Sequence, residues 1–196
     1  MRRIFFAVFL ISWIFFLKSA GAEYVSVDTF DDQAKPNNLG GDYGVWKINW
    51  EDPHQDCQMS YDRFEKVDKW GMALKIAYDV DSDAKAECGF FTVLGRGTDL
   101  RNYDRLIFYV KGDAKEGFTT QVEIEISSSV QTSVYLVTCI SAEWQKKTIM
   151  LDNFKDIKDW SDINRVSLII KDTTATEKKG VLYIDDIYFS DDEKVM

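Results

Sequence analysis

Side chains suited to binding a sugar recur in segments of the chain that alternate between apolar and polar residues. In residues 121–126, Gln121 and Glu123 alternate with valine and isoleucine, so we expect them on the polar face of a strand. Sugar rings pack their C–H faces on aromatic rings, and their hydroxyls hydrogen-bond to amides and carboxylates. The alternative is an ordinary wet face, with each aromatic residue in the core. The candidate binding residues are Trp46, Arg96, Tyr109, Gln121, Glu123 and Tyr135.

Aspartates gather at the end of the first expected strand, residues 24–30, and within the last, residues 180–189. Calcium takes roughly six to eight oxygen ligands, and carboxylates together with the carbonyls of residues 37–41 could supply them. First and last strands commonly lie side by side in jelly rolls, which would bring the acids together. The alternative is a group of solvated strand-end acids. The predicted ligands are Asp28, Asp31, Asp185 and Asp186, with Asp32 beside them.

The sequence offers little that could catalyse a reaction. His54 is the single histidine, which excludes a site built from several histidines. A Ser-His-Asp triad would have to use His54, which makes that interpretation forced. Cys57 follows His54 closely, but a cysteine in a secreted loop more often forms a disulfide than acts as a nucleophile. A pair of carboxylates for glycoside hydrolysis needs a separation that sequence does not give. With no long insertions to build a deep cleft, we expect a non-catalytic protein.

The first 22 residues have the pattern of a signal peptide. A basic start precedes an apolar run over residues 4–17, and Ala20, Gly21 and Ala22 form a small-residue end. The apolar run is shorter than the roughly 20 residues that cross a bilayer, although an uncleaved anchor stays open. We therefore predict cleavage after Ala22, a secreted or periplasmic protein without a membrane span, and one domain over residues 23–196.

Charge and cysteine content restrict the partners and the covalent links. The net charge of −9 repels phosphate backbones, so nucleic acid is not an expected partner. Three cysteines permit at most one intramolecular disulfide. Cys57 and Cys88 flank one predicted strand and could face each other on neighbouring strands, whereas Cys139 would be a buried, small apolar residue. Spacing alone leaves the pairing open.

Alternation with a period of two residues dominates the chain and predicts an all-β fold. Residues 99–126 contain two such runs joined by Gly- and Lys-rich turn residues, which predicts an antiparallel hairpin. Residues 153–163 are the one segment that could form a helical turn or two. About ten short strands with long connections between some of them favour a sandwich of the jelly-roll type.

Three stretches carry a resemblance to a known family: VDTFDDQAKPNNLGGDYGVW from Val27, GFFTVLGRGTDLRNYDRLIFYVKGD from Gly89, and EWQKKTIMLDNF from Glu143 followed by GVLYIDDIYF from Gly180. In order and spacing they resemble galactose-binding-like jelly rolls, which include family 11 carbohydrate-binding modules and, more distantly, complex I intermediate-associated assembly factors. The resemblance spans nearly all of residues 23–196. It implies an antiparallel β-sandwich, a sugar-binding cleft on the concave sheet in many members, and structural calcium near the chain ends.

The sequence and the resemblance together predict a secreted, non-catalytic, carbohydrate-binding protein. The main alternative is a structural or assembly protein of the cell envelope that uses the same fold to contact another protein, because fold alone does not determine function. An exposed aromatic side chain on the concave sheet would favour glycan binding, whereas a wide apolar patch would favour a protein interface.

Overall fold

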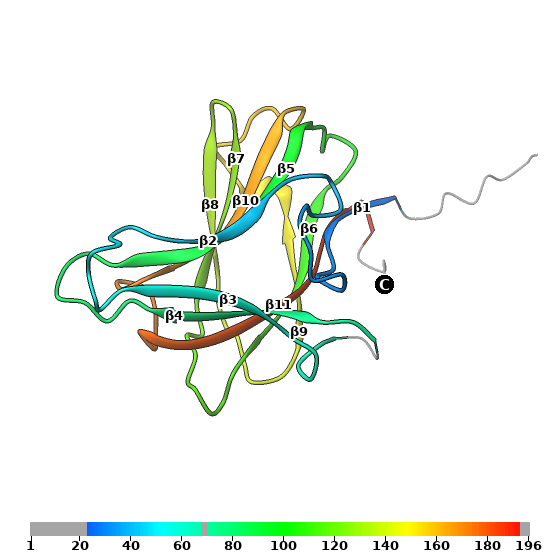
Figure 1. Ribbon diagram of the computed structural model, residues 1–196. Helices are drawn as coiled ribbons and strands as arrows, with labels where there is room; N and C mark the ends of the chain where they lie inside the picture. The colour runs from blue at the N-terminus through cyan, green and yellow to red at the C-terminus, as the bar shows by residue number, and fades with distance from the viewer. Residues whose placement is uncertain (1–22, 68–69, 193–196) are drawn as a thin grey trace, which may run out of the picture.

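Two antiparallel β-sheets pack face to face in the computed structural model, which describes residues 23–67 and 70–192 (Figure 1). The predicted signal peptide, residues 1–22, lies outside the described residues. Within the described ranges, the structure contains no helix with the length and hydropathy that a membrane crossing requires. The prediction of an all-β, antiparallel β-sandwich is confirmed.

The first sheet, called sheet A, has the strand order β3-β4-β11-β6-β9, and β1 pairs with β11 beyond the end of β4. This arrangement confirms that the first and last strands lie side by side. A short 3-10 helix, η1 (Leu151–Asn153), follows β9 and overlaps the segment in which the sequence predicted a helical turn, residues 153–163, only at Asn153; residues 154–163 form no helix. The strands of sheet A are β1 (Tyr24–Asp28), β3 (Asp56–Asp62), β4 (Ala73–Asp79), β6 (Arg105–Gly112), β9 (Gln145–Met150) and β11 (Lys179–Ser190).

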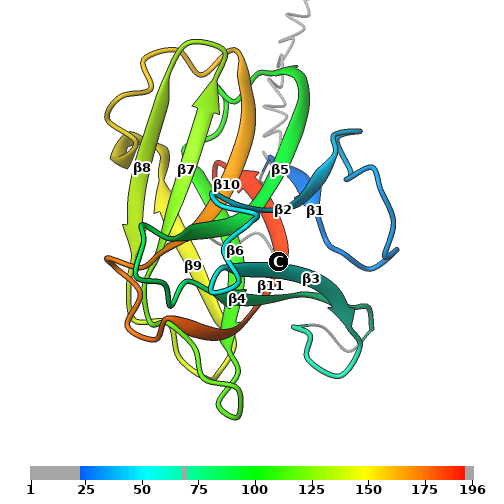
Figure 2. The ribbon, with the colours of Figure 1, turned by 60° about the vertical axis from the view of Figure 1, so that its left-hand side comes forward.

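The second sheet, called sheet B, has the strand order β2-β5-β10-β7-β8, and its strands lie side by side in Figure 2. Its pairing joins segments that are far apart in the chain, because β10 lies between β5 and β7. Edge strands β2 and β8 bound the sheet. The strands of sheet B are β2 (Tyr43–Lys47), β5 (Glu87–Thr98), β7 (Val122–Ser128), β8 (Thr132–Val137) and β10 (Ile163–Lys171).

The predicted hairpin over residues 99–126 is wrong. Both of its strands exist, as β6 and β7, but β6 pairs with β11 and β9 in sheet A. β7 pairs with β10 and β8 in sheet B. The connection between them therefore crosses from one sheet to the other. Alternation predicts that a strand exists, but the partner is chosen by long-range packing, and a connection of this length does not enforce local pairing.

The alternating apolar residues of both sheets meet in one core. On β7, Val122, Ile124 and Ile126 are buried, and the glutamates between them face outward. An aromatic group fills the core near β2, where the rings of Phe30, Tyr43 and Phe90 lie with centroids 6.0 to 6.1 Å apart. Such tilted and edge-to-face contacts add to the stabilisation from area burial. This group holds the edge strand β2 on the core.

Replacing Phe90 with alanine tests the packing of this aromatic group. Phe90 is 1% exposed, so Phe90→Ala is expected to lower the free energy of unfolding by about 3 to 5 kcal/mol through lost burial and a new cavity. The matched control is Phe64→Ala, because Phe64 is 84% exposed and its loss should change stability by less than about 0.5 kcal/mol. Equal losses for the two variants in chemical denaturation would contradict the packing described here.

Candidate ligand-binding face and acidic cluster

The outer face of sheet B combines an aromatic edge with a polar centre. The register of β2, β5, β10 and β7 puts the side chains that point away from the core on one surface. On the far edge, Val134 and Leu136 of β8 are exposed on the same face. The outward-facing residues of the first four strands include Trp46, Glu87, Phe91, Glu123, Glu125, Arg165, Ser167, Ile169 and Lys171.

A hollow of about 340 Å³ lies on this face. Ser167 and Ile169 of β10 form its floor and are buried, although they point away from the core. Gly89 lies opposite Trp46 in the register and places no side chain between the indole and Ile169. A Cβ at position 89 would come within 2.1 Å of the Leu168 carbonyl oxygen, so the close approach of β5 and β10 requires glycine there. The residues lining the hollow are Trp46, Glu87, Glu125, Arg165, Ser167, Ile169 and Lys171.

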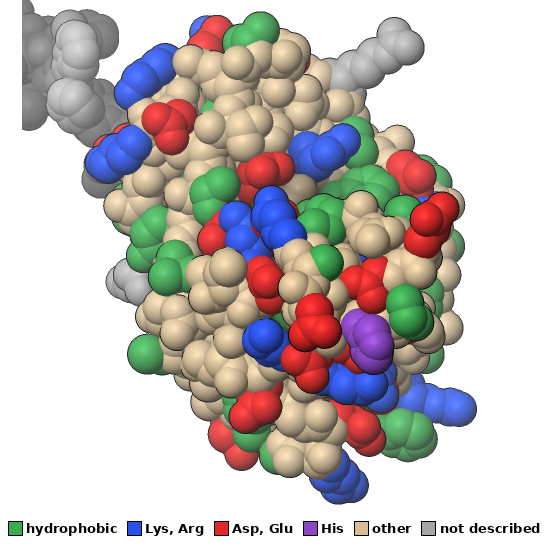
Figure 3. Space-filling view, turned by 90° about the vertical axis from the view of Figure 1, so that its left-hand side faces the viewer, with side chains coloured by type: hydrophobic (Ala, Val, Ile, Leu, Met, Phe, Trp, Pro, Cys, Tyr) green, Lys and Arg blue, Asp and Glu red, His purple; other side chains and the backbone are tan. Residues whose placement is uncertain are grey.

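Charges of both signs surround the hollow. The Lys171 ammonium pairs with Glu123 at 2.6 Å, and this hydrogen bond raises the pKa of Lys171, with further attraction from Glu87 and Glu125. The Arg165 guanidinium lies over the Phe91 ring, 5.6 Å from its centroid. In Figure 3, the view from the left of Figure 1, basic and acidic side chains are interleaved with hydrophobic ones. The face therefore offers donors and acceptors together rather than a field of one sign.

The structure brings only some of the predicted sugar-binding residues to this face. Trp46 lines the hollow, and Glu123 lies beside it through its ion pair with Lys171. Gln121 immediately precedes β7, and its carbonyl oxygen accepts a hydrogen bond from the Thr119 hydroxyl at 2.9 Å. Arg96 lies on β5, and its side chain is outside the described part of the structure.

Tyr109 and Tyr135 do not belong to this face, which corrects their grouping with Glu123. Tyr135 pairs with the buried Ile124, and its ring packs against Phe154 at a centroid distance of 6.1 Å. Tyr109 lies on β6, in the other sheet. Tyr109 was misplaced for the same reason as the hairpin, because β6 and β7 were assigned to one sheet. Tyr135 belongs to the same sheet as Glu123 but lies on its core-facing side.

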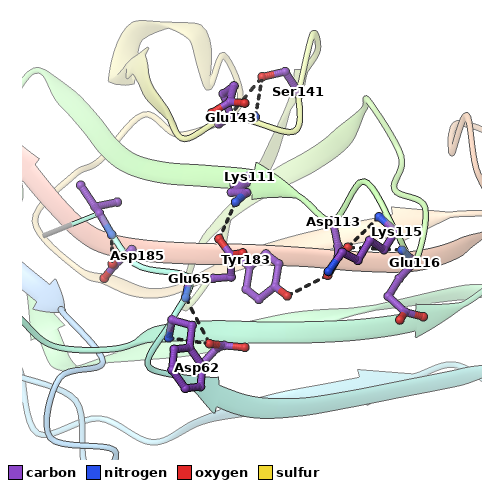
Figure 4. Close-up of polar contacts among 12 residues, drawn as sticks. Asp62, Glu65, Lys111, Asp113, Lys115, Glu116, Ser141, Glu143, Tyr183 and Asp185 are labelled. Atoms are coloured by element: carbon purple, nitrogen blue, oxygen red, sulfur yellow. Dashed lines mark hydrogen bonds and ion pairs between the residues drawn. The ribbon is translucent and has the colours of Figure 1, made fainter. Parts of the chain in front are cut away.

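Side chains of sheet A and of its connections contact one another on the face around β6 (Figure 4). The Tyr183 hydroxyl donates to Asp113 at 2.9 Å, and Lys111 pairs with Glu65 from the β3–β4 connection. Burial, followed by the hydrogen bond to Asp113, raises the pKa of Tyr183 above its ordinary value. Polar groups here are thus engaged within the protein.

Sequence reasoning missed Phe91, Glu125, Arg165 and Lys171. Their signal was available in part, since Arg165, Ser167 and Lys171 alternate with the apolar residues of β10. The alternation identifies their face but does not show that β10 lies between β5 and β7. That placement puts Lys171 between Glu87 and Glu123.

Two of the predicted metal ligands, Asp185 and Asp186, lie where β11 departs from regular pairing. The register of β11 shifts between Asp185 and Tyr188, and Asp186 adopts a φ of 49°. The Asp185 carboxylate accepts a hydrogen bond from the Val67 amide at 3.1 Å. Asp31 accepts one from the Met72 amide at 3.0 Å, so both acids bind the β3–β4 connection.

Burial strongly perturbs two of these acids. It raises the pKa of Asp28 to about 6, with smaller contributions from repulsion by Asp32 and Asp31. It raises the pKa of Asp185 to about 7, and repulsion by Asp186 and Asp31 adds to the effect. One oxygen of Asp28, Oδ2, is buried without a hydrogen-bond partner. These carboxylates therefore carry an unfavourable charge in the absence of a cation.

The donor chemistry fits a calcium ion only in part. In the described part of the chain, no group of three or more His, Cys, Asp or Glu side chains is arranged to hold a metal ion. The carbonyl oxygens of residues 37–41, which were expected to bind calcium, are in part already hydrogen-bonded. The Asn37 and Gly41 carbonyl oxygens each accept a hydrogen bond within that loop, at 2.9 Å.

The cysteines differ from expectation in one respect. Cys139 is exposed, with a φ of 58°, and is not the buried residue that was predicted. Its position after β8 leaves it in a surface connection, which the apolar composition around it did not reveal. His54 is exposed, whereas Cys57 is buried with its thiol directed to the Gly89 carbonyl at 3.6 Å.

No protein-family model matches the sequence, and no curated protein does. Solved structures with a similar fold include a family 11 carbohydrate-binding module from Clostridium thermocellum in complex with a β-1,3-1,4-mixed-linked tetrasaccharide. It is 16% identical, with a TM-score of 0.63 over 87% of this chain and 96% of that one. The module of the cellulosomal cellulase Lic26A-Cel5E of the same organism is also 16% identical, with a TM-score of 0.59 over 86% and 94%.

An exo-β-agarase contains a similar domain within a longer chain. It is 14% identical, with a TM-score of 0.58 over 84% of this chain and 25% of the agarase. At these identities the likeness concerns the fold. The two-sheet architecture described above is similar in fold to the β-sandwich of the family 11 carbohydrate-binding modules.

Proposed function

We propose that this protein is a secreted, non-catalytic, glycan-binding protein whose binding site is the hollow on the outer face of sheet B. The observation that carries the proposal is the combination of Trp46 with the polar side chains around Ser167 and Ile169 in one hollow. An aromatic ring beside carboxylates, a guanidinium and a hydroxyl matches the two surfaces of a sugar ring. The shared fold with carbohydrate-binding modules supports the same function.

The charges of the hollow favour neutral glycans over polyanionic ones. The positive charge of Lys171 is already paired with Glu123, and the negative charge of Glu125 lies nearby. A sulfated or uronic chain would meet these carboxylates at short range and lose more solvation than it gains. The family 11 module in complex with a β-1,3-1,4-mixed-linked tetrasaccharide makes a neutral mixed-linked tetrasaccharide of this kind the first ligand to test.

A second hollow, of about 260 Å³ and lined by Asp79 and Lys179, is a weaker candidate. Its aromatic residue, Tyr78, is buried and donates its hydroxyl to the Glu177 carbonyl oxygen at 3.0 Å. It offers no ring face on which a sugar could stack.

The outer face of sheet B also argues against the envelope-assembly alternative. A protein interface would need a wide apolar patch, but charged residues occupy the centre of this face, and the exposed apolar residues Val134 and Leu136 lie at one edge.

We also propose that a calcium ion occupies the acidic cluster of Asp28, Asp31 and Asp185, with Asp186 beside them. The buried, unpartnered Oδ2 atom of Asp28 supports a cation there. Calcium would supply positive charge between carboxylates that otherwise repel one another. It would tie β1 and β11 to the β3–β4 connection, through Asp31 and Asp185, and its role would be structural.

The binding proposal is tested by a glycan array, followed by titration calorimetry with a β-1,3-1,4-mixed-linked tetrasaccharide. Trp46→Ala is expected to weaken binding about tenfold or more, since lost stacking of about 1.4 kcal/mol corresponds to a factor of ten. Trp70→Ala is the matched control, because Trp70 is exposed on the β3–β4 connection of sheet A and should leave affinity unchanged. Binding of the wild type to no glycan would refute the proposal and favour the assembly alternative.

The cation proposal predicts how stability depends on pH. In the folded protein Asp28 and Asp185 hold protons up to a pH of about 6 and about 7, whereas the unfolded chain releases them near 3.8. The folded state therefore binds more protons between these limits, and stability in chelator should fall as pH rises from about 4 to 7. For Asp28 alone the loss is about 3 kcal/mol.

Millimolar calcium should remove most of this decline, because the ion stabilises the charged carboxylates. Melting temperatures are measured from pH 4.5 to 8 in chelator and in calcium. Asp185→Asn should flatten the curve in chelator, and Asp83→Asn, at an exposed site of the β4–β5 connection, should not. Identical curves with chelator and with calcium would show that the cluster holds no cation.

A further inference from the structure

The edge strands β2 and β3 lie next to each other and close one side of the sandwich, although they belong to different sheets (Figure 1). Polar side chains cross this seam. The Tyr43 hydroxyl of β2 hydrogen-bonds to the Tyr61 hydroxyl of β3, and the Lys47 ammonium donates to the Gln55 carbonyl oxygen at the other end. The seam is therefore held at both ends by hydrogen bonds between the sheets.

Two thiols lie inside this seam. Cys57 of β3 is 5% exposed, and Cys88, on the β5 strand that neighbours β2, is fully buried. The Cys57 thiol reaches across the core to the Gly89 carbonyl oxygen, 3.6 Å away, and Gly89 directly follows Cys88 on β5. The sequence left open whether the two cysteines face each other on neighbouring strands, and the structure places them on strands of opposite sheets. A disulfide between them would bring the sulfur atoms to about 2.05 Å.

We propose that Cys57 and Cys88 form a disulfide that joins sheet A to sheet B when the chain folds in the presence of a disulfide oxidant. The thiolate of one cysteine attacks the oxidant's disulfide and forms a mixed disulfide. The second thiolate then displaces the remaining half of the oxidant. Two protons leave the cysteines, two electrons pass to the oxidant, and the oxidant ends as two thiols.

The burial of both sulfur atoms sets when this reaction takes place. The neighbouring Cys57 thiol and, after it, burial raise the pKa of the Cys88 thiol, so little nucleophilic thiolate exists in the folded protein. An oxidant also has no access to a fully buried sulfur. The bond therefore forms before the sheets close, and the folded, reduced protein is slow to oxidise.

The bond would constrain residues 57–88, which include β3, β4 and the start of β5. Cross-linking this loop lowers the entropy of the unfolded chain and so stabilises the folded one. It would also fix the seam beside β2, the strand that carries Trp46. The ordinary alternative is two reduced cysteines that serve as small apolar core residues.

The test uses Cys139→Ser as the background, because Cys139 is exposed and would itself react with the oxidant. This protein is unfolded, reduced, and refolded with oxidised glutathione. The expected product is lighter than the reduced protein by about 2 Da, and proteolysis without reductant should yield one peptide pair containing Cys57 and Cys88. Reduction should lower its melting temperature by several degrees.

The matched control is Cys57→Ala combined with Cys88→Ala in the same background, whose melting temperature should not respond to reductant. The mass measurement on the two-cysteine protein stands even if this control folds poorly. Recovery of both cysteines as alkylated thiols after refolding with oxidised glutathione would overturn the proposal. So would an unchanged mass.

Discussion

The pairing of β11 with three other strands holds sheet A together. β4 and β1 pair end to end along one side of it, and β6 pairs along the other. All of its residues but the first are buried, so the strand contributes a large part of the apolar area that the core removes from water. The register of β11 shifts against β6 between Asp185 and Tyr188, and the pairing of β1 with β11 shifts between Ser26 and Asp28, so the acidic cluster lies where both ladders are irregular.

The hollow on sheet B depends on the pairing of strands that lie far apart in the sequence. Trp46, Glu87 and Lys171 come from β2, β5 and β10, and the pairing of β10 between β5 and β7 brings them together. Gly89 adds a second requirement, a backbone approach that excludes any side chain. Sheet pairing thus determines which side chains become neighbours, and glycine determines how deep the surface is.

Much of the fold could be predicted from alternation, because a period of two is a local property of each strand. Val122, Ile124 and Ile126 identify the buried face of β7 without any knowledge of its partners. Residues of the candidate site could be predicted only where the alternation within a single strand identified the outward face, as for Glu123 and Trp46. Tyr109 and Tyr135 were misplaced because alternation says nothing about which sheet a strand joins, or which of two faces meets the core when both are partly apolar.

The two ends of the described chain, near Glu23 and Asp191, lie next to each other. The Glu23 amide donates to Asp191 at 2.9 Å, and the Asp191 amide donates to the Glu23 carbonyl oxygen at 3.2 Å. Both ends thus belong to strands of sheet A, while the hollow lies on the outer face of sheet B. A fluorophore, a surface tether or a second polypeptide could therefore be attached at either end of residues 23–192 without lying in the hollow. Immobilisation by either end would present the same face to a ligand in solution.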